Sequence, residues 1–174
     1  MRNALTLLRV SLEDPYDPLA VPTKAYDLGL NVLGEGALRE TIYQAINLTA
    51  LLSQMTAGAE GAGRTPVAIL NEVAAESTVG DACTLTEVRL SADLMATAMK
   101  ARDLGLLASD ESLRTGLYQA VTLATGLVQA AAKAEGLGRS PIEILNEVSA
   151  QFEMQNAISP FGFPDASDGR HEPD

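Results

Sequence analysis

The sequence has little of what most active sites and disulfide scaffolds require. It contains no tryptophan, one cysteine and one histidine, and aromatic residues make up 4% of its 174 residues. A single cysteine, Cys83, cannot form an intramolecular disulfide, and a catalytic thiol would need a histidine beside it. The single histidine, His171, falls in a terminal stretch rich in Pro, Gly and acidic residues. We therefore expect neither cysteine catalysis nor a nucleophilic triad.

Sequence patterns typical of metal and phosphate sites are also missing. The chain has no CxxC pair, no HExxH and no calcium-loop pattern. A carboxylate-bridged di-metal bundle would need Glu-x-x-His pairs inside its helices. The glycine-rich turns at 61–63 and 136–138 lack the lysine of a phosphate-binding loop. We predict no metal, no cofactor and no catalytic residue, which favours a protein that is not an enzyme.

Long apolar runs and basic clusters are absent as well. No apolar run approaches the roughly 20 residues that span a bilayer, and Arg9 and Glu13 interrupt the apolar N-terminal stretch, which therefore does not resemble a signal peptide. The net charge is −11, and the 12 basic residues are scattered singly, which disfavours direct binding to nucleic acid. We expect a cytoplasmic protein with no membrane contact. Abundant Ala, Gly and Arg suggest a bacterial or phage origin.

What the sequence does contain is a long internal repeat. Residues 57–73 recur at 132–148, and 21 of 39 positions are identical between 38–76 and 113–151. Hydrophobic residues make up 47% of the chain, and a core poor in aromatics suits closely packed helices better than sheets. We predict an all-α fold, a tandem duplication of a three-helix unit packed as a helical bundle with pseudo-twofold symmetry.

The first helix of each unit differs between the two copies. Residues 3–13 fit an alternating strand and also a one-sided helix, and comparison with the second copy favours the helix. In that second copy one long helix is expected from near Thr84 to Gly105, with Val88, Ala92, Met95 and Met99 as its inward stripe. In the first copy prolines interrupt this helix, and a short helix is expected from Pro22 to Leu28.

The other two helices of each unit have clearer signals. Helical spacing with a wide apolar face begins at Leu38 and at Leu113, and it predicts two long central helices. Thr65-Pro66 and Ser140-Pro141 predict the start of the third helix in each unit. The expected domains are repeats at 1–76 and 84–158, a connector at 77–83 and a flexible acidic tail at 159–174. Both repeats are expected to form one compact domain.

Polar residues at matching places in the two repeats are the candidate binding residues. An arginine precedes the third helix in each repeat, where it can bind a carboxylate such as Glu60 or Glu135, or the end of the preceding helix. The functional alternative is that paired Arg and Glu line a groove on the pseudo-twofold axis that binds a partner or a small anion. The candidate residues are Arg64, Arg139, Glu72, Glu147, Tyr43, Tyr118, Phe161 and Phe163.

Phe161 and Phe163 enter this set for a different reason. They are two of three phenylalanines in the chain, and both fall in the polar tail. Aromatic side chains in such a tail can anchor in a groove of the same molecule or of a partner.

Three functions are compatible with these patterns. The favoured hypothesis is a non-enzymatic interaction or regulatory module of bacterial or phage type, which presents an acidic helical surface or an inter-repeat groove to a protein partner. The second is a small-ligand or enzymatic site between the repeats that uses Arg, Glu and Tyr. The third is an acidic mimic of nucleic acid that inhibits a DNA-binding protein. The duplication could have replaced a homodimer, or the chain could itself dimerise.

Overall fold

The computed structural model describes residues 2–30, 34–60, 63–134 and 138–158, with side chains up to Gln151. These ranges contain eight helices and no strand, so the all-α prediction is confirmed. The tail at 159–174, with Phe161 and Phe163, lies outside the described residues. The helices are α1 (Arg2–Glu13), α2 (Ala20–Asp27), α3 (Glu35–Glu60), α4 (Pro66–Ala75), α5 (Gly80–Ser91), α6 (Leu94–Asp103), α7 (Asp110–Ala134) and α8 (Pro141–Ile158).

Helix α1 resolves the ambiguity at residues 3–13 in favour of the helix. Its buried side chains, Ala4, Leu7 and Leu8, recur every three to four residues and so lie on one helical face. Helix α2 starts at Ala20, slightly earlier than expected, and contains Pro22 in its first turn. Proline is tolerated there because the first N–H groups of a helix have no intrahelical partner.

The single helix expected from Thr84 onward is wrong, because the chain breaks after Ser91. Ala92 has an extended backbone (φ −145°, ψ −178°), and the Asp93 side chain accepts a hydrogen bond of 2.9 Å from the Ala96 N–H. An aspartate at this position starts a new helix, so α5 and α6 are separate. Helix α5 begins at Gly80, within the stretch expected as the connector. The break at Ala92 adds one helix to those expected, so the described chain has eight helices.

Helices α2 and α6 end in the same way, at the repeated Asp-Leu-Gly-Leu sequence. Gly29 and Gly105 have positive φ angles of 71° and 74°. The N–H groups of Leu30 and Leu106 each donate to a carbonyl five residues earlier, at 3.1 Å. This is the Schellman motif, which requires a left-handed residue and favours glycine. Gly105 was predicted as a helix end, and this is confirmed.

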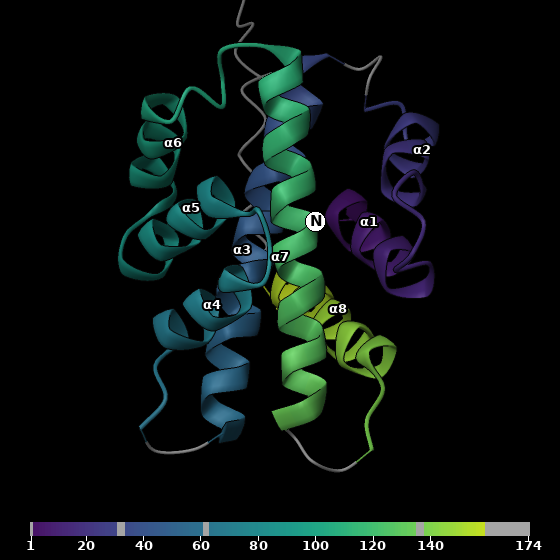
Figure 1. Ribbon diagram of the computed structural model, residues 1–174, viewed down its shortest axis with the longest axis vertical. Coiled ribbons are helices and arrows are strands. Elements are labelled where there is room, and N and C mark those ends of the chain that lie inside the picture. The colour runs from purple at the N-terminus through teal and green to yellow at the C-terminus, as the bar shows by residue number, and fades with distance from the viewer. Residues whose placement is uncertain (1, 31–33, 61–62, 135–137, 159–174) are drawn as a thin grey trace, which may run out of the picture.

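The long helices α3 and α7 form the centre of the molecule and make the most extensive contact in it. They run side by side in the same direction, with α1 and α2 on one side and α4, α5 and α6 on the other (Figure 1). Leucine and alanine side chains fill the space between them, as the composition requires. The fully buried side chains of α3 and α7 include Leu38, Ile46, Leu48, Leu52, Leu113 and Leu117.

Two contacts tie shorter helices to this pair, and a third joins α4 to α5. The buried hydroxyls of Thr49 on α3 and Thr86 on α5 are hydrogen-bonded at 2.7 Å. Helix α4 approaches α7 closely at Gly126, where an added Cβ would lie 2.5 Å from Cγ1 of Val73. Cys83, expected in a connector, is instead buried in α5. Its Sγ lies 3.4 Å from Oδ1 of Asn71 on α4.

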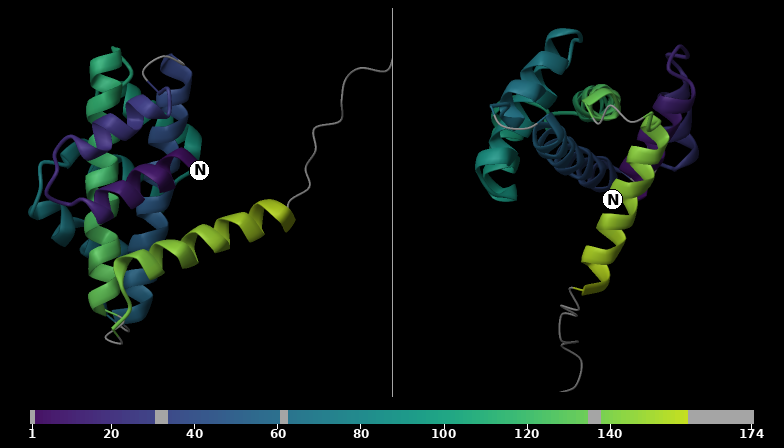
Figure 2. Two further views of the ribbon diagram at one scale, coloured as in Figure 1. Left: turned by 90° about the vertical axis from the view of Figure 1, so that its right-hand side faces the viewer. Right: turned by 90° about the horizontal axis from the view of Figure 1, so that it is seen from below.

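Helices α4 and α8 start as predicted. The Thr65 hydroxyl accepts a hydrogen bond from the Ala68 N–H at 3.1 Å. At α8 the Ser140 N–H donates to Oε2 of Glu143 at 2.6 Å, and the Glu143 N–H donates back to the Ser140 hydroxyl at 3.3 Å. This reciprocal pair is a capping box, and it lowers the pKa of Glu143. Helix α8 then runs away from the bundle axis (Figure 2).

Candidate functional site

The predicted Arg64 and Arg139 lie in the segments that join α3 to α4 and α7 to α8, which we call the two corners. Arg64 Nε lies 3.1 Å from Oε2 of Glu60 at the end of α3, and Arg64 Nη2 contacts Oε2 of Glu72 on α4. In the second corner Arg139 Nη2 lies 2.5 Å from Oε2 of Glu147. Glu135, the other expected partner, lies outside the described residues.

These corner ion pairs are exposed, so they contribute little stability each. The side chains of Arg64 and Glu72 are 40% and 68% exposed, and those of Arg139 and Glu147 are 39% and 40% exposed. Exposed ion pairs are worth at most about 1 kcal/mol because water and salt screen them. The contact of Arg64 with Glu60 is the one that the structural interpretation of these arginines expected.

The structure places the predicted tyrosines away from the corners. Tyr43 lies near the start of α3, and Glu60 ends that helix, so about 25 Å of helix separates Tyr43 from the Arg64 corner. The structure therefore brings Arg64 to Glu72 and Arg139 to Glu147 but separates Tyr43 from the Arg64 corner. Burial raises the pKa of Tyr43, and the positive charge of Arg39 offsets part of this increase. Burial likewise raises the pKa of Tyr118, with Arg114 offsetting it. Both phenols are therefore neutral hydrogen-bonding groups near pH 7.

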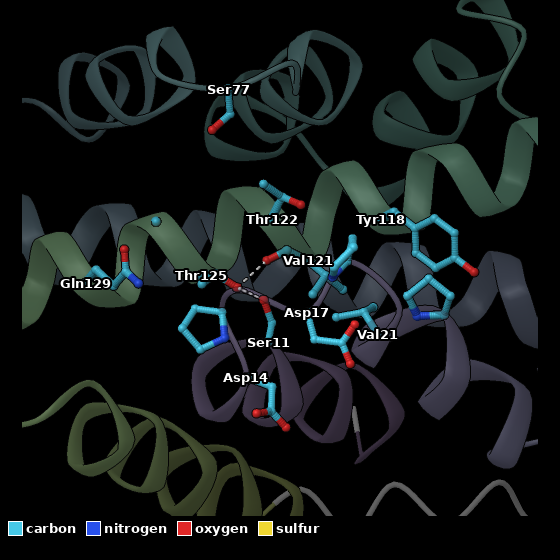
Figure 3. Close-up of a pocket in the computed structure, with 14 residues that line it drawn as sticks. Ser11, Asp14, Asp17, Val21, Ser77, Tyr118, Val121, Thr122, Thr125 and Gln129 are labelled. Carbon is cyan, nitrogen blue, oxygen red and sulfur yellow. Dashed lines mark hydrogen bonds between the residues drawn. The ribbon is translucent and has the colours of Figure 1, made fainter.

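Tyr118 lines a surface cavity of about 390 Å³ between α7 and the segment that joins α1 to α2 (Figure 3). The hydroxyl of Thr125 on α7 donates to Oγ of Ser11 on α1 at 2.9 Å and so connects the two sides of this cavity. The cavity is lined by Ser11, Asp14, Pro15, Asp17, Pro18, Val21, Pro22, Ser77, Tyr118, Val121, Thr122, Thr125, Gly126 and Gln129.

A second, more open hollow of about 860 Å³ continues this cavity toward the turn between α4 and α5. The two share Ser77, Tyr118 and Thr122. Glu76 and Thr115 are among the residues that line the second hollow. Together they form one surface along α7, which we call the α7 groove.

Tyr43 lines a different hollow, of about 460 Å³, between α3 and α6. We call it the α6 hollow; its lining residues are Glu40, Tyr43, Gln44, Asn47, Leu94, Met95 and Ala98.

Met95 and Gln44 show the polarity of the α6 hollow. Met95 is 68% exposed, so the hollow has an apolar rim that solvent reaches. Gln44 donates from Nε2 to Glu40 Oε1 at 2.8 Å, while its buried Oε1 has no hydrogen-bond partner among the described residues. The surface that the hollow offers to a ligand is therefore mainly apolar, since the unpaired Gln44 oxygen is itself buried.

The sequence interpretation of Met95 and Met99 is wrong. They were expected on the inward stripe of one long helix, but they are 68% and 63% exposed. The reason is the break at Ala92 and Asp93, which changes the direction of the chain and so interrupts the helical period. The Asp-Pro-Tyr-Asp-Pro sequence at 14–18 was interpreted only as a helix break, although it supplies one wall of the α7 groove. The repetition of Asp-Pro was the available signal.

The two hollows present hydrogen-bonding groups and apolar surface. Among residues with a described placement, no group of three His, Cys, Asp or Glu side chains is arranged to hold a metal ion. Both hollows offer carboxylates, hydroxyls and apolar surface, and their tyrosines have pKa values raised further from neutrality, which is unsuited to proton transfer near pH 7. In the same part of the chain no helix has the length and apolar character needed to cross a membrane.

Comparisons of the chain with protein-family models, with curated proteins and with solved structures found no match.

Proposed function

We propose that the chain is a non-enzymatic protein-interaction or regulatory module, of bacterial or phage type, whose partner docks at the α6 hollow. One observation carries the proposal. Of the seven exposed large hydrophobic side chains in the described chain, Tyr16, Leu19 and Tyr26 lie on α2 or in the turn before it, on the other side of the central helices from α6 (Figure 1). Three others, Leu94, Met95 and Met99, gather on the ten-residue helix α6. Exposed apolar side chains gathered on one element typically mark interaction surfaces.

The flexible methionines suit this role. Met95 and Met99 are separated by one helical turn and lie beside Leu94 at the start of α6. Unbranched thioether side chains adapt to partner surfaces of different shapes. The α6 hollow next to them provides a recess for an apolar side chain of the partner, which is where interface energy concentrates.

We further propose that the two halves of the chain arose by duplication and are related by a pseudo-twofold axis between α3 and α7. Contacts between helices support this, since α1 packs against α7 while α5 packs against α3. The hollows support it as well. Tyr43 and Gln44 line the α6 hollow, and Tyr118 and Gln119, which occupy the matching positions 75 residues later, line the α7 groove.

The test is to introduce charge on the apolar rim of the α6 hollow. In the variant Met95→Glu/Met99→Glu, two exposed positions change, so the fold should be retained, and capture of a protein partner from a bacterial lysate should fall at least tenfold. The matched control Gln54→Glu/Ala59→Glu adds the same charge to exposed positions of α3. Captured proteins are identified by mass spectrometry, and light scattering shows whether the partner is a second copy. Equal capture by both variants, or capture of nothing specific by the wild type, contradicts the proposal.

A further inference from the structure

The α7 groove carries negative charge that the protein does not neutralise locally. Asp14, Asp17 and Glu76 are exposed and line it, and its lining contains no Lys, Arg or His. Within the described ranges none of these three carboxylates takes part in an ion pair. One oxygen of Asp17 accepts a hydrogen bond from the Leu19 N–H at 2.8 Å. A ligand with positive charge would therefore meet unpaired acceptors.

The prolines of the groove reinforce this acceptor character. Pro15, Pro18 and Pro22 line the α1–α2 side, and proline has no backbone N–H to donate. This wall therefore adds rigid apolar surface beside Asp14 and Asp17 without adding backbone donors. Long basic side chains place their aliphatic stems on apolar surface of this kind while their charged ends reach acceptors.

The opposite side of the groove is formed by α7 and offers hydroxyls. Figure 3 shows Tyr118 on α7 with Asp14 and Asp17 on the α1–α2 side below it, while Thr122 projects from α7 toward Ser77. The raised pKa keeps the half-buried Tyr118 phenol protonated, so it can accept from an ammonium or guanidinium group and donate to a backbone carbonyl. Both sides of the groove thus suit a basic segment of polypeptide.

The geometry points to a partner of this chemistry. We infer that the α7 groove binds an extended segment of a protein partner that carries lysine or arginine side chains. The hollows of about 390 and 860 Å³ provide room for several side chains rather than one ion, and the net charge of −11 favours approach of a basic chain. This inference rests on the proposed interaction function and assigns a second surface to it.

The experiment measures a defined peptide directly. A fluorescein-labelled nonapeptide of alternating Ala and Arg is titrated with the full chain, and anisotropy gives its affinity. In the variant Asp14→Asn/Asp17→Asn, which keeps the shape and the hydrogen bond to Leu19, binding should weaken roughly fivefold to tenfold, as expected for two exposed charge pairs. The matched control Asp103→Asn/Glu111→Gln removes the same charge from exposed positions outside the groove and should bind as the wild type does.

Three results overturn the inference: no binding by the wild type, equal weakening in both variants, and displacement of the peptide by spermidine at equal concentration. Equal weakening would mean attraction by the overall charge, and displacement would mean a site for small cations. In the supporting case, amide resonances of Thr122 and Tyr118 shift on titration, while that of Tyr43 does not. Failure here with successful partner capture at the α6 hollow removes this inference alone. Failure of both removes the proposed function.

Discussion

The close approach of α4 and α7 at Gly126 gives the sharpest test of the packing. In Gly126→Ala the new Cβ would lie 2.5 Å from Cγ1 of Val73, closer than two carbon atoms can come. Valine is β-branched and its χ1 is stiff, so relief requires the helices to move apart. Overpacking of this kind costs about 1–3 kcal/mol. Alanine also gains about 1 kcal/mol over glycine in a helix, which leaves a net loss of about 1 kcal/mol.

A matched control separates the two effects. Gly58 lies in α3, and a Cβ added there meets nothing within 4 Å. Gly58→Ala should therefore gain up to about 1 kcal/mol from helix propensity alone. The two substitutions are chemically identical but should shift stability in opposite directions. For a chain of this length the two melting temperatures should differ by roughly 4–8 °C.

The assay is urea unfolding followed by circular dichroism at 222 nm, since the described chain is mostly helical. A double-mutant cycle with Val73→Ala removes the obstructing methyl groups. In that background Gly126→Ala should cost less stability than in the wild type, by at least about 1 kcal/mol. If Gly126→Ala stabilises the protein as much as Gly58→Ala does, and the cycle shows no coupling, α4 does not contact α7 at this point.

Two further predictions concern the candidate residues. Arg64→Ala and Arg139→Ala should each cost at most about 1 kcal/mol because their ion pairs are exposed, and the cost should shrink in 1 M NaCl; losses above about 2 kcal/mol in urea unfolding would contradict this. The pKa values of Tyr43 and Tyr118 are raised in the folded state by burial, so their contribution to stability is complete below about pH 10, the usual tyrosine value, and is lost as pH rises through the folded pKa. The urea midpoint should fall from pH 8 to pH 11, and it should fall less in Tyr43→Phe and in Tyr118→Phe than in the wild type. An identical fall in the wild type and both variants would show that burial does not raise the pKa of these phenols.

The sequence by itself determined the helical class and most helix bounds. The period of Leu, Ile and Ala in 38–60 and 113–134 required amphipathic helices, and Thr65-Pro66 and Ser140-Pro141 marked helix starts that the structure reproduces. These are local effects, since capping hydrogen bonds and side-chain periods involve residues within one or two turns. The helix ends at Gly29 and Gly105 are local for the same reason.

Only the tertiary structure decided which surfaces are free to bind. Met95 and Met99 have the composition of a core stripe, and their exposure follows from the change of direction at Ala92, which a period cannot show. The α7 groove joins Asp14 and Asp17 to Tyr118, about 100 positions away in the sequence. Which residues meet across such a distance is set by how α1 packs against α7. The sequence alone could pair Arg64 with Glu60 one turn away, but it could not bring together the two sides of a groove.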